Sequence, residues 1–239
     1  MEKKIDIYSD GIGCVEYVSH MGSDVTVVNS ARVSFGKNVS SLSSGDIKLI
    51  KYLIKNKHTS TLEHNVMTFR FKVPIFIRSQ HHRHRTWSYN EISRRYTDFN
   101  LEFYEPIRFR KQSNSNRQAS VDEYINPIFP AGEGITNIHY IASKRVKSFH
   151  KEALALYNTL IKHGVCREQA RGVLPQNLYT EYYGTVNLNN LFKFIDLRTH
   201  KGAQWEIQQV AQACLDIAKE LFPATVQSYM DIKKGEKNA

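Results

Sequence analysis

The segment from Arg78 to Tyr96 restricts what this chain can fold into more than any other stretch of its sequence. It contains five arginines and a single acidic residue, Glu91, so it is too polar to form part of a core. Arginine stays charged at any working pH, and its forked guanidinium matches phosphate and carboxylate groups. A solvated basic turn would account for the charge. The close mixture with Ser88 and Ser93 instead indicates a site that grips an anion and also reads a polar ring edge.

The apolar pattern on both sides of this segment predicts a mixed α+β fold in a single domain over residues 1–239. Strict alternation over Met67–Val73 predicts a half-buried strand, and Pro74 ends that strand and suits the first position of a helix. A second strand is expected over 178–186, and a disordered tail from about residue 233. Apolar residues at steps of three and four predict helices over 44–57, 144–163 and 203–222. The 144–163 helix has the most regular pattern, and we expect it to pack in the core.

Shorter features complete the expected fold. Val25–Val28 is rich in β-branched residues and predicts a strand. Ser88 and Glu91 have the spacing of a capping box, which predicts the start of a helix inside the arginine-rich segment. A short helix is expected over 166–173, and residues 97–140 are expected to be irregular.

Composition narrows the class of protein without choosing a function. The net charge of +10 favours anionic partners, which include nucleic acid, membrane surfaces and phosphorylated small molecules. The three cysteines, Cys14, Cys166 and Cys214, are widely spaced and form no C-x-x-C pair, which is typical of a reducing compartment. No apolar run is suited to export or approaches the roughly 20 residues that span a bilayer. We therefore expect a soluble cytoplasmic protein with no membrane partner.

Two functions other than small-molecule chemistry fit part of the pattern. A nucleic-acid-binding protein would use the basic charge together with Trp87, Tyr89 and Tyr96, which can stack on bases. A metal-dependent hydrolase would need a metal site, and several histidines are available for one. No H-E-x-x-H or Cys/His spacing supports such a site, so we expect no metal. These histidines are His58, His64, His81, His82 and His84.

The arginine-rich segment resembles the signature of the flavin-dependent thymidylate synthases, R-H-R-x-x-S-x-N-E-x-S-x-R-Y. All nine specified positions match: Arg83, His84, Arg85, Ser88, Asn90, Glu91, Ser93, Arg95 and Tyr96. A motif with so many fixed positions is a specific signal. Upstream, residues 58–64 are similar to the histidine, hydroxyl and Glu-His group that members of this family carry before their signature.

Two later segments resemble the same family. Residues 169–175 contain Ala170-Arg171 and then Leu174-Pro175, similar to a family A-R-x-x-L-P whose arginine binds the nucleotide. Residues 197–207 contain Leu197-Arg198 and then an A-Q-W-E-I sequence, and the family arginine at this point contacts the pyrimidine ring. The resemblance covers segments from about residue 58 to 207. It implies the fold of the family, with a central antiparallel-type sheet and long packing helices.

The resemblance implies a reaction that this chain's side chains cannot carry out alone. It implies reductive methylation of dUMP to dTMP, with 5,10-methylenetetrahydrofolate as carbon donor and FAD, reduced by NADPH, as hydride source. No enzyme cysteine acts as nucleophile in that chemistry. Arg198 is the catalytic candidate, because an arginine near a ring carbonyl stabilises negative charge developing there. The family assembles as homotetramers with active sites between subunits, and we expect the same here, with no nucleic acid among the partners.

The resemblance also assigns individual residues to ligands. The residues expected at dUMP are Gln80, His81, His82, Arg83, Glu91, Ile92, Ser93, Arg94, Arg95, Arg171 and Arg198. Those expected at FAD are Ser60, Glu63, Arg83, His84, Arg85, Thr86, Asn187, Asn189 and Lys193. Further candidates are His58, Ser88, Asn90 and Tyr96.

The chain departs from the family pattern at three positions on the flavin side. Asn189 stands where members often have arginine, and Lys193 stands where they often have asparagine. Gly202 precedes the A-Q-W sequence in place of a histidine, and the nearest histidine is His200. A lysine at 193 suits contact with a pyrophosphate.

Overall fold

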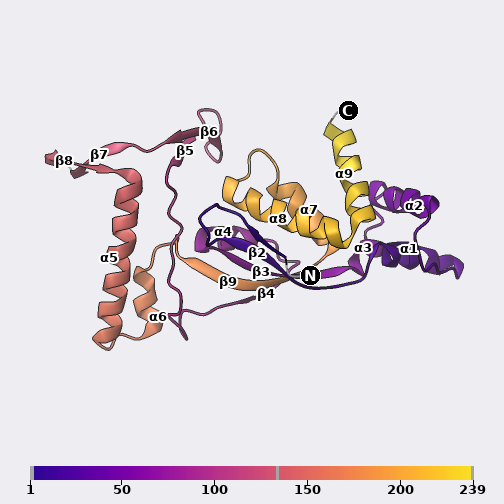
Figure 1. Cartoon of the computed structure of the whole chain (residues 1–239), viewed down its shortest axis with the longest axis horizontal. Coiled ribbons are helices and arrows are strands. Elements are labelled where there is room, and N and C mark those ends of the chain that lie inside the picture. Colours follow the sequence, from indigo (N-terminus) through magenta and orange to yellow (C-terminus); the bar gives the residue numbers. More distant parts are fainter. Residues whose placement is uncertain (1–2, 133–134, 238–239) are drawn as a thin grey trace.

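A five-stranded antiparallel sheet forms the middle of the molecule, as the computed structural model of the chain shows for residues 3–132 and 135–237 (Figure 1). The order of its strands is β1-β2-β3-β9-β4, so the last strand in the sequence lies between two earlier ones. The strands are β1 (Lys4–Asp6), β2 (Cys14–Met21), β3 (Val66–Pro74), β4 (Ser88–Glu91) and β9 (Tyr179–Asn187). The mixed α+β fold with a central antiparallel sheet is confirmed.

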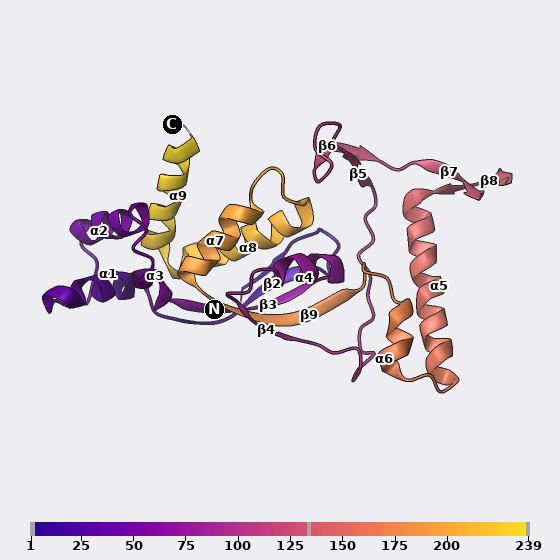
Figure 2. The same cartoon turned by 180° about the vertical axis from the view of Figure 1, so that it is seen from behind.

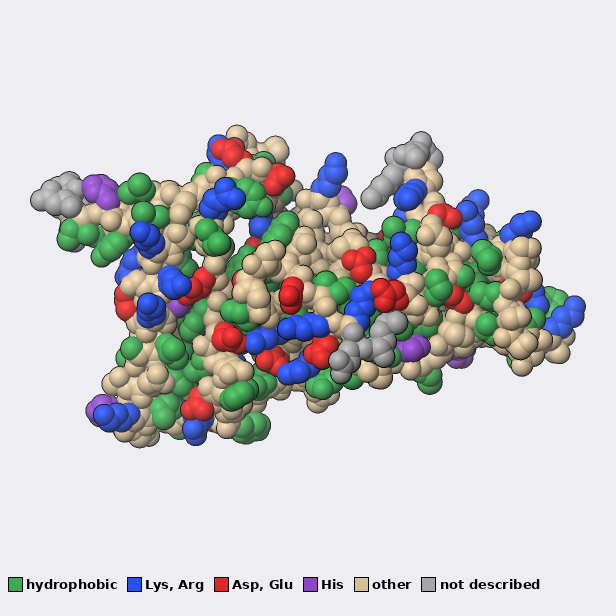
Figure 3. Space-filling model, in the orientation of Figure 1, with side chains coloured by type: hydrophobic (Ala, Val, Ile, Leu, Met, Phe, Trp, Pro, Cys, Tyr) green, Lys and Arg blue, Asp and Glu red, His purple; other side chains and the backbone are tan. Residues whose placement is uncertain are grey.

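The two faces of the sheet differ as the alternation in β3 predicts. Met67, Phe69 and Phe71 are fully buried under the packing helices. Between them, Arg70 points to the other face, where it forms an ion pair with Glu181 of β9 and another with Glu16 of β2. Acidic and basic side chains alternate over the middle of the molecule on the face seen in Figure 3. One face of the sheet therefore belongs to the core, and the other carries cross-strand charge pairs.

Three helices lie against the apolar face of the sheet: α4 (Ile75–His81), α7 (Leu188–Arg198) and α8 (Trp205–Leu221). Pro74 precedes α4 as expected, and the side chain of Asn187 caps α7 by accepting from the backbone N–H of Asn190. The inward positions of α8, among them Ile207 and Cys214, are buried as its periodicity predicts. These helices bring the ends of α4 and α7 to the same edge of the sheet.

The remaining helices of the body cluster together at one end of the molecule (Figures 1 and 2). They are α1 (Asp24–Arg32), η1 (Val33–Phe35), α2 (Ser44–Lys55), α3 (Ser60–Glu63) and α9 (Pro223–Lys237). The prediction of a strand over Val25–Val28 was wrong, because Ser23 and Thr26 form a capping box that starts α1 there. The tail expected from residue 233 continues as helix α9 to Lys237, and residues 238–239 lie outside the described part.

A second part of the chain stands away from the body at the opposite end, and both views show α5 separated from α7 and α8 (Figures 1 and 2). The irregular stretch expected over 97–140 contains two hairpins in this part. The elements here are β5 (Phe109–Gln112), β6 (Ser120–Ile125), β7 (Ile128–Gly132), β8 (Ile135–Ile141), α5 (Ala142–Lys162), α6 (Arg167–Ala170) and η2 (Arg171–Val173).

Helix α5, Ala142–Lys162, begins two residues and ends one residue before the predicted 144–163, but it does not have the predicted place in the core. Tyr157 is buried, and His150 is buried and stacks on Phe103, whereas Phe149 and Leu156 are about half exposed, at 48% and 49%. Periodicity shows that a helix has an apolar side, but it does not show whether one chain covers that side. The description of α5 as a core-packing helix is therefore corrected.

Candidate functional site

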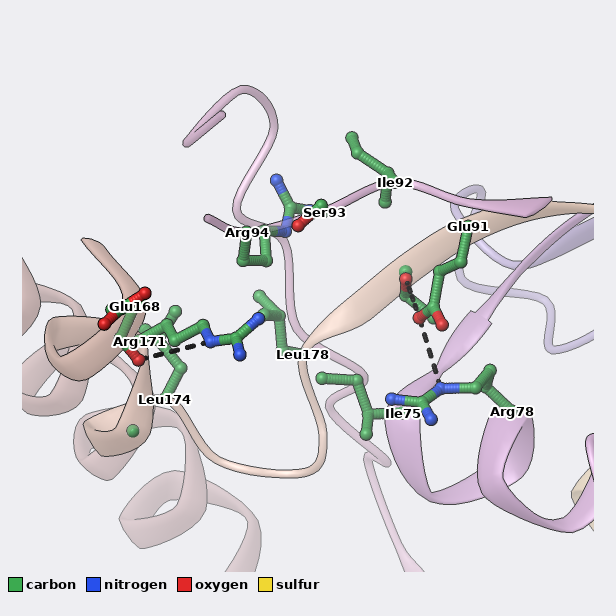
Figure 4. A pocket seen from close by; sticks show the side chains of 12 residues that line it. Ile75, Arg78, Glu91, Ile92, Ser93, Arg94, Glu168, Arg171, Leu174 and Leu178 are labelled. Atoms are coloured by element: carbon green, nitrogen blue, oxygen red, sulfur yellow. Dashed lines mark hydrogen bonds and ion pairs between the residues drawn. The ribbon is translucent and has the colours of Figure 1, made fainter. Parts of the chain in front are cut away.

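A pocket of about 590 Å³ opens between β4, the start of α4 and the α6–η2 turn (Figure 4). It joins the signature segment to the second arginine segment, which is about 80 residues later in the sequence. Its lining residues are Ile75, Arg78, Glu91, Ile92, Ser93, Arg94, Glu168, Arg171, Gly172, Leu174, Leu178 and Thr180. We call it the β4–α6 pocket.

One wall of the β4–α6 pocket is already paired. The Oε1 atom of Glu91 accepts a hydrogen bond of 2.7 Å from Thr180 Oγ1 and lies 3.1 Å from Arg78 Nε in an ion pair. Glu91 is the last residue of β4, and Thr180 lies on the adjacent strand β9. The sheet thus fixes the position of this carboxylate.

The opposite wall offers an unneutralised cation. Arg171 is exposed, its guanidinium points into the pocket in Figure 4, and its Nε donates to the backbone oxygen of Glu168 at 3.3 Å. The Glu168 carboxylate lies on the side of Arg95, with 3.4 Å between Oε2 and Arg95 Nη2. A bound anion in this pocket would meet Arg171 and the hydroxyl of Ser93.

The structure brings five of the residues predicted at dUMP to the β4–α6 pocket: Glu91, Ile92, Ser93, Arg94 and Arg171. Arg94 has a structural task as well, because its guanidinium donates to the backbone oxygens of Phe99, Asn100 and Tyr179. Sequence reasoning missed Arg78 and Thr180. Arg78 belongs to the same basic segment and lies shortly before the signature, which was an available signal. Nothing in the sequence singles out Thr180.

A second group of predicted residues meets at the end of α7. Arg198 Nε donates to His84 Nε2 at 3.0 Å, and Arg198 Nη2 donates to the backbone oxygen of Gln80 at 3.3 Å. Burial lowers the pKa of Arg198 somewhat, and the half-buried guanidinium keeps a fixed direction. We call Gln80, His84 and Arg198 the α7-end group.

The protonation state of His84 follows from this arrangement. Burial, with the Arg198 guanidinium beside the ring, lowers the pKa of His84 to about 4. The ring is therefore neutral near pH 7, and since its Nε2 accepts from Arg198, the proton resides on Nδ1. A neutral acceptor holds the arginine without cancelling its charge.

The two groups lie on different sides of α4. Arg78 faces the β4–α6 pocket, and Gln80 faces the start of α8, where its amide nitrogen donates to Gln204 Oε1. Residues two positions apart in an α-helix, such as these, point in directions that differ by about 200° around the helix axis. Within one chain, the residues predicted at dUMP are thus divided between two places.

Histidines 81 and 82 pack within the fold. His81 is fully buried, and its Nδ1 shares a hydrogen bond of 2.8 Å with the hydroxyl of Tyr182. Burial, with the neighbouring His84, lowers the pKa of His81 well below its usual value. His82 stacks on Tyr89 with 4.1 Å between ring centroids. The His81 ring packs against Trp87 and Phe194 inside the fold, and its assignment to dUMP stays a prediction.

Five of the residues expected at FAD, named below, form a third group on α3 and at the start of α7. Asn189 is buried, and its Nδ2 donates to Glu63 Oε1 at 2.9 Å, while Asn187 is occupied as the cap of α7. Lys193 is exposed on α7, with its Nζ 3.4 Å from Asn190 Oδ1, and Ser60 is exposed at the start of α3.

The remaining candidates lie outside this third group. Arg83, Arg85 and Thr86 are exposed in the turn between α4 and β4. Ser88 and Asn90 are on strand β4, so the predicted helix start at Ser88 was wrong: pairing with β9 outweighs the capping-box spacing. His58 stacks on Tyr52, and Tyr96 lies beside the Arg95 guanidinium.

Other features of the described residues bear on the alternatives. No group of three metal-ligating side chains lies close enough together to hold an ion within residues 3–132 and 135–237. No helix in the described part of the chain is long and apolar enough to cross a membrane. The three cysteines are free thiols, and burial raises the pKa of Cys14 and of Cys214.

Comparison with known proteins gives a consistent result. The family model described as thymidylate synthase complementing protein matches residues 16–224. A flavin-dependent thymidylate synthase of Thermus thermophilus is 43% identical over 211 residues, covering 88% of this chain and 73% of that protein. One of Treponema denticola is 37% identical over 240 residues, covering 100% of this chain and 85% of its own length. A crystal structure of the UMP/dUMP methylase PolB from Streptomyces cacaoi with 5-Br dUMP has a TM-score of 0.77 at 31% identity, covering 95% and 97% of the two chains.

Proposed function

The chain belongs to the flavin-dependent thymidylate synthase family, and we propose that it methylates dUMP to dTMP with 5,10-methylenetetrahydrofolate and NADPH-reduced FAD. The observation that supports this most strongly is the β4–α6 pocket, where Ser93 and Glu91 of one family motif meet Arg171 of another. A basic nucleic-acid-binding function has no support from the relatives.

The β4–α6 pocket suits the phosphate and sugar end of dUMP. Arg171 and the Ser93 hydroxyl provide donors for phosphate oxygens, and Glu91 provides an acceptor for a sugar hydroxyl. The apolar side chains of Leu174 and Leu178 shield these contacts from water. Hydrogen bonds to a charged group are worth about 1.5–3 kcal/mol each, so this wall can supply much of the binding free energy.

The α7-end group suits the pyrimidine ring. The Arg198 guanidinium, held by His84 and by the Gln80 backbone, can donate to a ring carbonyl oxygen. A fixed donor in a half-buried position stabilises negative charge on that oxygen and needs no rearrangement as the charge develops. Arg198 thereby favours an electron-rich ring that can attack the carbon donor.

The third group has a donor set that fits FAD. Lys193 of this group, together with Arg83 and Arg85 in the turn between α4 and β4, supplies exposed cations that match a pyrophosphate. When bound, reduced flavin supplies the hydride that completes the methyl group. The Asn189 amide is engaged by Glu63, so Lys193 is the stronger candidate for the pyrophosphate.

The visible absorption spectrum of the purified protein tests this function. We expect an oxidised flavin band that bleaches anaerobically after NADPH is added, at a rate that depends on dUMP, followed by dTMP formation once the folate is present. A protein that shows no band after incubation with excess FAD, and no dTMP, would contradict the proposal. Salt-sensitive affinity for oligonucleotides without dUMP binding would favour the nucleic-acid alternative.

We also propose that the chain is one domain and that the active form is a homotetramer with active sites between subunits. Two observations support the assembly. The dUMP residues are divided between two sides of α4, and helix α5 carries half-exposed Phe149 and Leu156 on one side. Hydrophobic side chains also gather over α5 and the β7–β8 hairpin in Figure 3.

Sedimentation velocity tests the assembly. Leu156→Lys places a charge on the exposed side of α5 and should shift the sedimentation coefficient to smaller species, with loss of dUMP-dependent flavin reduction. Val33→Lys changes another exposed apolar residue, 71% exposed in η1, and should leave the assembly intact. Equal sedimentation of both variants would exclude α5 as an interface.

A cytoplasmic location is proposed as well, since the thiols are free and the substrates are intracellular.

A further inference from the structure

A second pocket of about 590 Å³ lies between the last turn of α7, the loop that follows it, and helices α8 and α9. These three helices lie beside one another in both views of the molecule (Figures 1 and 2). The pocket is separate from the β4–α6 pocket and shares no lining residue with those assigned to dUMP or FAD. We call it the α7–α9 pocket.

The floor of the α7–α9 pocket is apolar. Ile195 of α7 and Leu215 of α8 are buried there, and Met230 of α9 is half-buried. Tyr229 is buried as well, and its ring stacks on Phe192 with 4.0 Å between the ring centroids, which fixes this side of the pocket. Methionine adapts its shape to a flat neighbour, so the floor suits an aromatic ring.

One wall of the pocket carries a carboxylate in a fixed position. Asp196 Oδ1 accepts a hydrogen bond of 2.6 Å from the Tyr229 hydroxyl, and Asp196 Oδ2 lies 3.1 Å from Lys233 Nζ in an ion pair. Each carboxylate oxygen has two lone pairs, so Asp196 can accept a further N–H group from a ligand. The amino group of an adenine ring is a donor of this kind.

The rim of the pocket has an excess of positive charge. Lys201 of the loop and Lys234 of α9 are exposed and line the pocket. No carboxylate within residues 3–132 and 135–237 forms an ion pair with either of them. Lysine binds phosphate as a point charge, and a phosphate monoester carries about 1.5–2 negative charges near pH 7. The two lysines therefore match one phosphate monoester group.

The α7–α9 pocket adjoins the group expected at FAD. Asp196 follows Lys193 by three residues on α7, so the two are separated by about 4.5 Å along the helix axis and lie on neighbouring sides of the helix. An extended ligand with one end in the pocket can thus lie along α7 toward the flavin. Among the substrates of the proposed reaction, NADPH combines an adenine, a phosphate monoester and a hydride donor in one extended molecule.

We propose that the α7–α9 pocket binds the adenosine 2′-phosphate end of NADPH. The adenine lies on the apolar floor with its amino group toward Asp196, and the 2′-phosphate lies between Lys201 and Lys234. NADH and FAD both lack the 2′-phosphate, so the two lysines select NADPH over each of them. This inference rests on the proposed function, in which NADPH reduces the flavin.

Calorimetric titration of the FAD-loaded enzyme with adenosine 2′,5′-bisphosphate and with 5′-AMP tests the pocket without turnover. We expect the bisphosphate to bind more tightly. Lys201→Gln combined with Lys234→Gln should reduce the ratio of the 5′-AMP to the bisphosphate dissociation constant about tenfold, which corresponds to about 1.4 kcal/mol. The ratio of the rates of anaerobic flavin reduction by NADPH and NADH should fall with it, while flavin content stays unchanged.

Two further variants separate the phosphate from the adenine and from general surface charge. Lys219→Gln removes an exposed lysine of α8 that does not line the pocket, and it should keep both ratios. Met230→Trp fills the floor without changing the charge. It should weaken the binding of both adenosine ligands and leave the ratio of their dissociation constants unchanged.

The outcomes are distinct. If the unaltered enzyme binds neither FAD nor dUMP, the proposed function fails. If it binds both, the inference is overturned when the bisphosphate binds no more tightly than 5′-AMP, when the double lysine variant keeps the ratio, or when Lys219→Gln loses it equally. Unchanged binding in Met230→Trp would also overturn it, since the adenine would then lie elsewhere.

The glutamate tail of the folate is a second anionic source, and titration with p-aminobenzoylglutamate distinguishes it. We expect its binding to be the same in the unaltered enzyme and in the double lysine variant. Loss of its binding in that variant, with unchanged binding of the adenosine ligands, would assign the pocket to the folate and overturn the inference.

Discussion

Two arginines assigned to the same nucleotide have opposite surroundings. Arg198 is half-buried, with its guanidinium held by the neutral ring of His84 and by the backbone of Gln80. Arg171 is exposed at the α6–η2 turn, and its side chain contacts a backbone oxygen of its own turn. One residue is fixed before a ligand arrives, and the other can adjust to it.

This difference separates two tasks. A group that stabilises charge during a reaction gains from being held in place, because no free energy is then spent on reorganisation. A group that only binds phosphate can remain mobile, since its contribution is the same in the ground state and in the transition state. We therefore expect Arg198 to affect kcat and Arg171 to affect the dUMP requirement.

Arg198→Ala should produce the largest effect. Loss of a fixed donor to a developing oxyanion typically lowers kcat by about 10²–10³. FAD binding should persist, because Lys193, Arg83 and Arg85 are unchanged. Single-turnover formation of dTMP by the FAD-loaded variant measures this. Near-normal turnover would show that Arg198 takes no part in the chemical step. The contrast between Arg198 and Arg171 would then not reflect two different tasks.

Arg171→Ala should act on binding alone. Loss of a charge-assisted hydrogen bond of about 1.5–3 kcal/mol raises the dUMP dissociation constant about 10–100-fold. The rate at saturating dUMP should be retained. Arg167→Ala is the matched control, because Arg167 begins α6, the short helix that directly precedes Arg171, and pairs with Asp98 outside the pocket. An unchanged dUMP titration in Arg171→Ala would refute its assignment.

Glu91→Gln tests the wall of the β4–α6 pocket whose side chains are already paired, and its effect can be compared with that of Arg171→Ala. The change keeps the shape of the side chain but weakens its ion pair with the partly exposed Arg78. A pair of this kind contributes about 0.2–1 kcal/mol, so the dUMP dissociation constant should rise by a factor of about 1.4 to 5. Titration beside the Arg171 variant measures it. An effect larger than that of Arg171→Ala would show that the fixed wall dominates binding.

The smallest expected effect concerns pH and the neutral ring that holds Arg198. The folded-state pKa of His84, about 4, is below the usual 6.5, so the unfolded chain binds a proton between these values and the folded chain does not. Stability should therefore fall as pH falls from about 6.5 to 4. In His84→Gln this acid-side loss should shrink, with a Tm difference of about 2 °C at pH 5. Identical Tm–pH profiles would mean that the ring is not held neutral.

Much of the body was predictable because its elements follow one periodicity each. The strand around Phe69, the strand expected over 178–186 and the helix around Cys214 all have the expected type, since the apolar pattern and the flanking residues of each element agree. The two wrong elements carry competing signals. At Val25 β-branched residues compete with a helix cap, and at Ser88 a cap spacing competes with pairing to a strand about 90 residues later.

The site was predictable in its residues but not in its grouping. Motif resemblance singles out Ser93, Arg171 and Arg198, yet it cannot show that α4 separates them into two places. Thr180 was missed because its role comes from facing Glu91 across two strands. The place of α5 was missed because exposure depends on what surrounds a helix, which its own periodicity does not encode.

The position of β9 has a consequence for how the protein is made. Strand β4 pairs within the sheet with β9 alone, and β9 ends at Asn187. While the ribosome adds the residues between Glu91 and Tyr179, the signature segment has no strand to pair with. Such long-range pairing slows folding and leaves a strand edge exposed to other nascent chains. The basic charges of that segment, which attract nucleotides in the finished enzyme, also keep growing chains apart until the last strand arrives.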